Sequence, residues 1–191
     1  MEMSHRSAPF EAILASAKSD LRELLSIPES HEILFLQGGA STQFATIPMA
    51  FQADGQVSRY VVTGSWGKKA VESAKLNGEA EVAWDGKSGG YRETPDEVAP
   101  AGPNVAYTHI TSNETIQGVR FQSDPAWGGS LVCDMSSDIL SRPVDVSKYD
   151  LIYAGAQNEM GPAGVVLVIV SKEMLARHND GLAPMFDYRV H

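Results

Sequence analysis

Cysteine, basic clusters and long apolar segments are what this sequence has least of. Cys133 is the only cysteine among 191 residues, which excludes an internal disulfide and favours a reducing, cytoplasmic location. Its apolar neighbours in "SLVCDM" favour a small buried side chain over a nucleophile. The apolar run "GVVLVIV" is too short to span a membrane, and the opening "MEMSHRSAPFEA" lacks the pattern of a signal peptide. We therefore expect no membrane partner.

Positive charge is also scarce. The chain carries 15 Lys and Arg against 24 Asp and Glu, a net charge of −9 at pH 7. Nucleic-acid surfaces need clustered Lys and Arg, so we expect no nucleic-acid partner. No metal site is expected either, because no paired ligand spacing is found at His31, His109, His178 and His191. The hydrophobic content of 43% is ordinary for a soluble globular chain.

Amphipathic segments and short apolar runs alternate along the chain. Apolar residues recur at steps of three, four and seven between 8 and 27, which predicts a helix capped by Ser7 and closed by Pro28. Further helices are predicted at 42–52, with Pro48 as a kink or end, at 65–78, capped by Ser65, and at 171–180. Continuous apolar runs predict strands at 32–37, 59–64, 79–84, 105–111, 129–136, 150–156 and 164–170.

This alternation indicates the fold class. Continuous apolar strands between helices are typical of an α/β protein, with a mostly parallel sheet covered by helices on both faces in three layers. Residues 85–104 are rich in Gly and Pro, and we interpret them as a connecting excursion with a short helix possible at "TPDEV". Ligands in such folds bind at the carboxyl ends of the strands, so the chemistry is expected just after each strand.

Several strand ends are followed by groups that suit an aromatic, phosphorylated ligand. Gly38 and Gly39 precede a helix whose N-terminus could seat a phosphate, although a plain turn is the more common meaning of this pattern. Trp66 follows another strand, either as a core residue or as a flat face for stacking a ring. Thr115 lies in the loop "SNETIQG", and Asp134 ends the strand "LVC", as a cap or as the partner of a cation.

The last of these strand ends is a confined polar loop, Gln157, Asn158 and Glu159, between Gly155 and Gly161. Together the groups predict a site for pyridoxal phosphate, because a buried carboxylate keeps the nitrogen of the pyridine ring protonated. Trp84 and Trp127 have no comparable neighbours, and we interpret both as core residues.

Six segments of the sequence resemble a known family. They are "MEMSHRS", "FLQGGASTQFATIP", "TGSWGKKAVESAK", "HITSNETIQG", "CDMSSDILSRPVDVSKYDLIYAGAQ" and "GPAGVVLVIV". Together, and in this order, they resemble the phosphoserine aminotransferases, fold-type-I pyridoxal-phosphate enzymes of class V. The resemblance covers the whole chain and implies that residues 1–191 form the cofactor-binding large domain. The N-terminal segment and the C-terminal small domain of the family are expected to be absent.

The resemblance also implies how the cofactor would be held. Ala40 and Ser41 would meet its phosphate at a helix N-terminus, and Gln157 would approach the same phosphate. Trp66 would stack on the pyridine ring, and Thr115 would form a hydrogen bond on the hydroxyl side of the ring.

The remaining implied roles concern the reaction. Asp134 would pair with the pyridinium nitrogen. His5 and Arg6 match the family's substrate segment, where a planar guanidinium can grip a carboxylate or phosphate at two points. The implied reaction converts glutamate and 3-phosphohydroxypyruvate into 2-oxoglutarate and O-phosphoserine in serine biosynthesis, and the implied assembly is a homodimer.

The loop after "AGAQ" departs from the family pattern. The family reads Gln-Lys-Asn, an apolar residue and Gly-Pro, and its lysine forms the Schiff base. Here the same frame begins Gln157-Asn158-Glu159, so Asn158 occupies the lysine position. An asparagine can neither form an imine nor shuttle the catalytic proton. We therefore expect impaired transamination.

Several explanations of this departure stay open. The chain could be a natural or engineered lysine-less variant, a truncated or decayed gene product, or a misread sequence in which a lysine before Asn158 has been omitted. Two functions compete with the enzyme hypothesis. One is a non-catalytic module that binds pyridoxal or pyridoxamine phosphate reversibly, and the other is an inert fragment.

Overall fold

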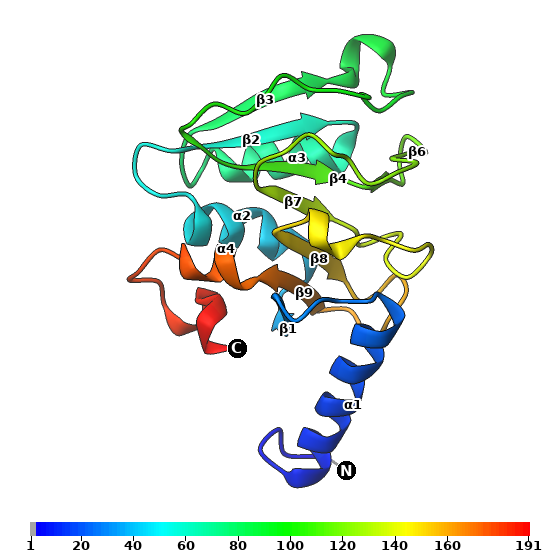
Figure 1. Cartoon of the computed structure of the whole chain (residues 1–191), viewed down its shortest axis with the longest axis vertical. Helices are drawn as coiled ribbons and strands as arrows, with labels where there is room; N and C mark the ends of the chain where they lie inside the picture. The colour runs from blue at the N-terminus through cyan, green and yellow to red at the C-terminus, as the bar shows by residue number, and fades with distance from the viewer. Residues whose placement is uncertain (1–2) are drawn as a thin grey trace.

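A seven-stranded mixed sheet forms the centre of the computed structural model, which describes residues 3–191 (Figure 1). Strand β9 is antiparallel to both of its neighbours, and all other neighbouring strands are parallel. This confirms the predicted mostly parallel α/β sheet. In sheet order the strands are β1 (His31–Gln37), β9 (Val165–Ser171), β8 (Leu151–Gly155), β7 (Leu131–Asp134), β4 (Val105–Thr111), β2 (Val57–Val62) and β3 (Ala80–Asp85).

The two faces of the sheet are covered differently. One face packs against helices α2 (Gly39–Phe51), α3 (Ser65–Ala74) and α4 (Lys172–Ala176). The other face packs against the end of helix α1 (Ala8–Leu24) and irregular segments of the chain. Cys133 is fully buried on this second face, as its neighbours predicted. Short 3-10 helices complete the chain at Gly86–Gly89, Val146–Lys148, Pro184–Phe186 and Tyr188–Val190.

Helix α1 extends away from the sheet and joins it only through its C-terminal end (Figure 1). Ser7 Oγ accepts a hydrogen bond from Phe10 N, which confirms the predicted cap. The helix ends at Leu24, three residues before the predicted end, because Ser26 adopts a φ of 50° that a right-handed helix cannot contain. No helix in residues 3–191 is both long and apolar enough to cross a membrane.

The other helices also differ from the predictions in detail. Helix α2 begins at Gly39, three residues before the predicted start, and continues past Pro48 to Phe51, so Pro48 is not its end. Helix α3 ends at Ala74, four residues before the predicted end. The N-cap of α3 is Gly64 and not Ser65, so the cap predicted from the hydroxyl is wrong. Helix α4 has only five residues, because Asn179 leaves the helical path and donates its backbone N–H to Ala50 O at 2.7 Å.

Residues 85–104 contain a short 3-10 helix at Gly86–Gly89 and no helix at "TPDEV", so that suggestion is wrong. Tertiary contacts keep this segment extended. Asp96 O accepts a hydrogen bond from Trp127 Nε1 at 2.9 Å, and Ala99 O accepts one from Arg59 Nη2 at 2.5 Å. A small hairpin that the sequence analysis missed, β5 (Asn113–Glu114) with β6 (Val119–Arg120), follows β4.

Candidate active site

A cavity of about 400 Å³ lies at the carboxyl ends of the parallel strands, where ligands of such sheets bind. Its volume is within the range of small-molecule sites. The sequence analysis named seven residues for a cofactor site, and all of them line this one cavity. They are Ala40, Ser41, Trp66, Thr115, Asp134, Gln157 and Asn158. The structure therefore places these residues around one cavity, and the role of each stays a prediction.

The N-terminus of helix α2 forms one wall of the cavity. Gly38 and Gly39 have φ angles of 93° and 65°, a left-handed backbone that glycine adopts without a steric cost. Gly38 N donates to Gly164 O at 2.9 Å, which ties the start of the helix to the start of β9. Ala40 and Ser41 thus lie in the first turn, whose backbone N–H groups have no partner within the helix. This end of α2 suits an anion such as a phosphate.

Trp66 presents its indole to the cavity from the start of α3. Its Nε1 donates to Thr115 Oγ1 at 3.1 Å, so the ring is tied to the hairpin that follows β4. Lys69 Nζ lies 4.2 Å from the centroid of the same ring, which is a favourable cation–π distance. The indole is half-buried, and its edge is fixed by the hydrogen bond to Thr115. An indole fixed in this way can serve as a stacking surface.

Asp134 ends β7 and reaches the cavity from the sheet. The residue is 5% exposed, and its Oδ1 accepts one hydrogen bond, from Ser136 N at 2.9 Å. Burial is the main cause that raises the pKa of Asp134 to about 6; hydrogen bonds with Ser136 oppose the rise, and the charges of Glu114 and Asp138 add to it. Within residues 3–191, no cationic side chain forms an ion pair with this carboxylate.

Ser136 organises the loop that carries Gln157 and Asn158. Its hydroxyl accepts a hydrogen bond from Gly155 N at 2.9 Å, and its carbonyl accepts one from Asn158 Nδ2 at 2.8 Å. The Asn158 amide is therefore engaged in the loop, on the same wall as Gln157. Among the described residues that line the cavity there is no lysine, arginine or histidine.

The lining fits the cofactor that the sequence predicts. Asp134 is a buried carboxylate that needs a cation, and a protonated ring nitrogen is one. Thr111 Oγ1 also lines the cavity and is buried without a hydrogen-bond partner among the described residues, so a polar ligand group would satisfy it. The N-terminus of α2 would hold a phosphate, and Trp66 would cover an aromatic ring.

A row of buried polar rings lies on the sheet face that packs against α2, α3 and α4. His109 Nε2 and Tyr153 Oη are 2.8 Å apart, and the His109 ring lies 5.1 Å from that of Tyr60. Burial lowers the pKa of His109 to about 3, so this imidazole is neutral. The row therefore adds no positive charge near Asp134.

His5 and Arg6 do not line the cavity. Both are exposed residues that precede α1, at the end of the chain that lies far from the sheet in Figure 1. Arg6 N donates to Ser4 Oγ at 3.3 Å, a contact within the same segment. Their predicted part in substrate binding stays a prediction.

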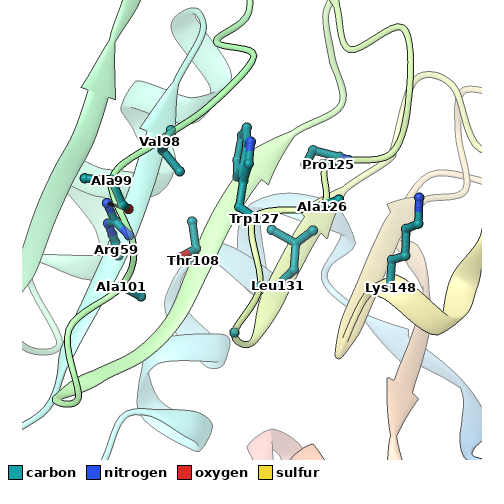
Figure 2. Close-up of a pocket in the computed structure, with 12 residues that line it drawn as sticks. Arg59, Val98, Ala99, Ala101, Thr108, Pro125, Ala126, Trp127, Leu131 and Lys148 are labelled. Carbon is teal, nitrogen blue, oxygen red and sulfur yellow. Dashed lines mark hydrogen bonds between the residues drawn. The ribbon is translucent and has the colours of Figure 1, made fainter.

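A second cavity of about 200 Å³ lies on the other sheet face and contains none of the predicted site residues (Figure 2). Arg59 on β2 is the buried charge in its wall, and Trp127 and Leu131 supply apolar surface. The Arg59 guanidinium donates to Ala99 O, and its Nε lies 3.5 Å from Glu81 Oε1. Because this charge already has partners in the chain, the first cavity remains the candidate site.

Sequence reasoning missed Ser136 and Glu114. Ser136 acts through its backbone and hydroxyl, and its only signal was its position two residues after Asp134. Glu114 is fully buried, and its carboxylate accepts hydrogen bonds from Trp66 N and Gly67 N. An acidic residue directly before Thr115, in a loop with few apolar residues, gave no sign that it would be buried.

Comparisons with known proteins identify the family of the chain. A profile of the aminotransferase class-V family matches residues 1–182. The chain is 49% identical over 192 residues to phosphoserine aminotransferase of Laribacter hongkongensis (strain HLHK9), an alignment that covers 100% of this chain and 54% of the relative. It is 48% identical over 193 residues to phosphoserine aminotransferase 1, chloroplastic, of Arabidopsis thaliana, with 100% and 45% covered.

Solved structures give the same result. Phosphoserine aminotransferase from Bacillus circulans subsp. alkalophilus has a TM-score of 0.94 at 47% identity, covering 100% of this chain and 53% of that one. A pyridoxal-phosphate-bound phosphoserine aminotransferase from Trichomonas vaginalis has a TM-score of 0.87 at 36% identity, with 99% and 57% covered. The chain thus spans about half the length of the relatives it matches.

Proposed function

The chain belongs to the aminotransferase class-V family, and from this premise we propose that residues 1–191 are the cofactor-binding large domain of a phosphoserine aminotransferase. The observation that carries the proposal is the single cavity shared by Trp66, Asp134 and the N-terminus of α2. These three supply an aromatic stacking surface, a buried carboxylate and an anion-binding helix N-terminus to the same cavity. Pyridoxal phosphate, the cofactor of the family, has a matching ring, ring nitrogen and phosphate.

The proposed reaction is the transfer of an amino group from glutamate to 3-phosphohydroxypyruvate, which gives 2-oxoglutarate and O-phosphoserine. Relatives that are nearly half identical to the chain carry the name phosphoserine aminotransferase, and this supports the choice of substrates. The proposed assembly is a homodimer. His5 and Arg6 are proposed to contact the anionic groups of the substrate, because Arg suits two-point recognition of a carboxylate or phosphate.

Each residue of the cavity has a distinct part in this proposal. Asp134 keeps the ring nitrogen protonated, because a buried carboxylate favours a neighbouring positive charge. Trp66 and Thr115 fix the plane of the ring, and the backbone N–H groups of Ala40 and Ser41 bind the phosphate, with Gln157 beside them. When bound, the cofactor supplies an electron sink for the substrate carbon.

Asn158 limits the reactions that the chain can catalyse with the bound cofactor. Its amide stands at the family's lysine position and donates a hydrogen bond to Ser136 O. An amide nitrogen is neither nucleophilic nor basic enough to attach the cofactor or to move a proton at the substrate carbon. We infer weak, reversible cofactor binding and little or no transamination by this chain.

A second candidate function follows from the same residue. A chain that holds pyridoxal or pyridoxamine phosphate through Trp66 and Asp134, without a lysine in the cavity, would act as a reversible binding module. An inert fragment is the third possibility. The two differ in whether the cofactor is bound at all.

One experiment separates the three functions. The purified chain is mixed with pyridoxal phosphate, its visible spectrum is recorded, and its intact mass is measured with and without borohydride. A saturable spectral change without covalent trapping is the expected result and supports reversible binding. Trapping at the 158 loop, with turnover near that of a lysine-bearing enzyme, would support full catalysis and contradict the inference about Asn158. An unchanged spectrum would support the inert fragment.

A further inference from the structure

Two neighbouring residues of the β5 hairpin hold Trp66 from two sides. Thr115 accepts the indole N–H, as described above. Glu114 accepts the backbone N–H groups of Trp66 and Gly67 at 2.9 and 2.8 Å, one on each carboxylate oxygen. The backbone and the indole of Trp66 are therefore fixed by adjacent residues of one hairpin, Glu114 at the end of β5 and Thr115 in the turn that follows.

Side chains of this hairpin take the place of a local cap for α3. The N-cap residue Gly64 has no side chain to accept a hydrogen bond. Gln117 Oε1 accepts Ser65 N at 3.0 Å, and Gln117 Nε2 donates to Ser65 Oγ at 2.7 Å. Glu114 and Gln117 together thus accept the N–H groups of residues 65–67. A carboxylate at a helix N-terminus is also favoured by the helix dipole.

The glycines at the start of α3 leave room for this contact. A Cβ added at Gly64 would lie 2.5 Å from Gln117 Oε1 and 2.6 Å from Glu114 Cδ. A Cβ at Gly67 would lie 3.2 Å from Glu114 Oε1. The backbone of "GSWG" is therefore shaped for a close approach of Glu114 and Gln117.

We propose that Glu114 is a positioning residue, whose buried carboxylate sets the first turn of α3 and thereby holds the Trp66 indole against the cofactor cavity. This inference rests on the proposed function, because that function supplies the pyridoxal phosphate on which Trp66 would stack. Glu114 is fully buried. Burial raises the pKa of its carboxyl, and the hydrogen bonds from Gly67 and Trp66 oppose that rise. Both oxygens are thus used on the backbone, and neither is assigned to the ligand.

The test uses Glu114→Gln in a chain that also carries Trp84→Phe and Trp127→Phe, so that Trp66 is the only tryptophan. The amide keeps the size of the side chain but turns a donor toward one of the two backbone N–H groups. The matched control is Glu72→Gln, which makes the same change at an exposed position of α3, where the Glu72 carboxylate lies 3.7 Å from Lys68 Nζ.

Two readouts are measured in each variant. Without cofactor, acrylamide quenching of Trp66 fluorescence is expected to increase in Glu114→Gln and to stay unchanged in Glu72→Gln. With pyridoxal phosphate, the dissociation constant is expected to rise about tenfold in Glu114→Gln only. This corresponds to the loss of one charge-assisted hydrogen bond that positions the backbone of Trp66. A loss of thermal stability with both readouts unchanged would mean that Glu114 has a structural role alone, and would overturn the proposal.

The design separates this inference from the proposed function. If the parent chain does not bind pyridoxal phosphate, the proposed function fails, but the quenching comparison still decides whether Glu114 holds Trp66. If Glu114→Gln does not fold, Gly67→Ala is used in its place in both measurements, because the added Cβ displaces the Glu114 carboxylate by a few tenths of an ångström. Unchanged quenching and affinity in Gly67→Ala would then count against the proposal.

Discussion

The indole Nε1 of Trp66 donates a hydrogen bond to Thr115 Oγ1 across 3.1 Å, and the two residues belong to different elements, α3 and the hairpin after β4. Both side chains line the cavity. The contact joins the stacking face of the site to the group expected beside the ring hydroxyl. A change at Thr115 should therefore affect ligand binding in two ways, through its own contact and through the orientation of Trp66.

Replacing Thr115 with Val removes the hydroxyl and keeps the shape. We expect the dissociation constant for pyridoxal phosphate to rise about fivefold, since a net hydrogen bond contributes about 1 kcal/mol. Absorbance titration measures this. Thr63→Val is the matched control, because Thr63 Oγ1 is buried without a partner among the described residues. Equal affinities of the Thr115→Val variant and the parent chain would refute the role of Thr115.

Gly38→Ala should destabilise the chain. An alanine there would need a φ of 93°, and its Cβ would lie 2.1 Å from Thr42 Oγ1. We expect a loss of about 2 kcal/mol or more in the free energy of unfolding by urea. Gly55→Ala is the control for backbone strain alone, because Gly55 has a φ of 79° and open space around the added Cβ; it should cost about 1 kcal/mol. Equal losses in the two variants would show that the packing at Gly38 does not matter.

Asp134 should make the stability of the ligand-free chain fall as pH rises. Its pKa is 3.8 when unfolded and about 6 when folded, so between these values the folded state binds more protons, and ionisation then favours unfolding. The free energy of unfolding should fall by about 3 kcal/mol in total as pH rises from 4 to 6, and Asp134 should cause no further change below or above that range. Urea unfolding of Asp134→Asn should lack this component of the decline. A parallel pH dependence in parent and variant would contradict the burial of an unpaired carboxylate.

Asn158→Lys should restore covalent attachment of the cofactor. A lysine amine at this position can bond to the cofactor aldehyde, and borohydride makes the bond permanent. Intact-mass measurement after reduction should show one cofactor per chain, at the 158 loop. The control is Asn77→Lys, an exposed position outside the cavity, which should trap none. Failure of Asn158→Lys to retain the cofactor would mean that residue 158 does not face the ring.

The strands and the place of the site were predictable because both follow from local patterns. Buried strands such as Val165–Ser171 read as continuous apolar runs, and side chains after strand ends meet at one edge of a sheet. The direction of β9 was not predictable, because an apolar run has the same pattern in either direction. Its antiparallel pairing depends on β1 and β8, which are distant in sequence.

Contacts with a distant part of the backbone could not be predicted from the sequence either. Glu114 is buried because the N–H groups of a helix that begins about fifty residues earlier in the chain satisfy it. The extended segment at Asp96 is set in the same way, by the hydrogen bond from Trp127 Nε1. The end of α4 depends on another distant contact, the backbone hydrogen bond from Asn179 N to Ala50 O. Tertiary contacts of this kind override local helix propensity.

The central claim, that Trp66 and Asp134 share one cofactor cavity, is tested most directly by titrating pyridoxal phosphate into the chain in which Trp66 is the only tryptophan. Saturable quenching of its fluorescence is predicted, together with at least a tenfold loss of affinity in Asp134→Ala. Absence of saturable quenching, or an affinity that Asp134→Ala leaves unchanged, would contradict the account.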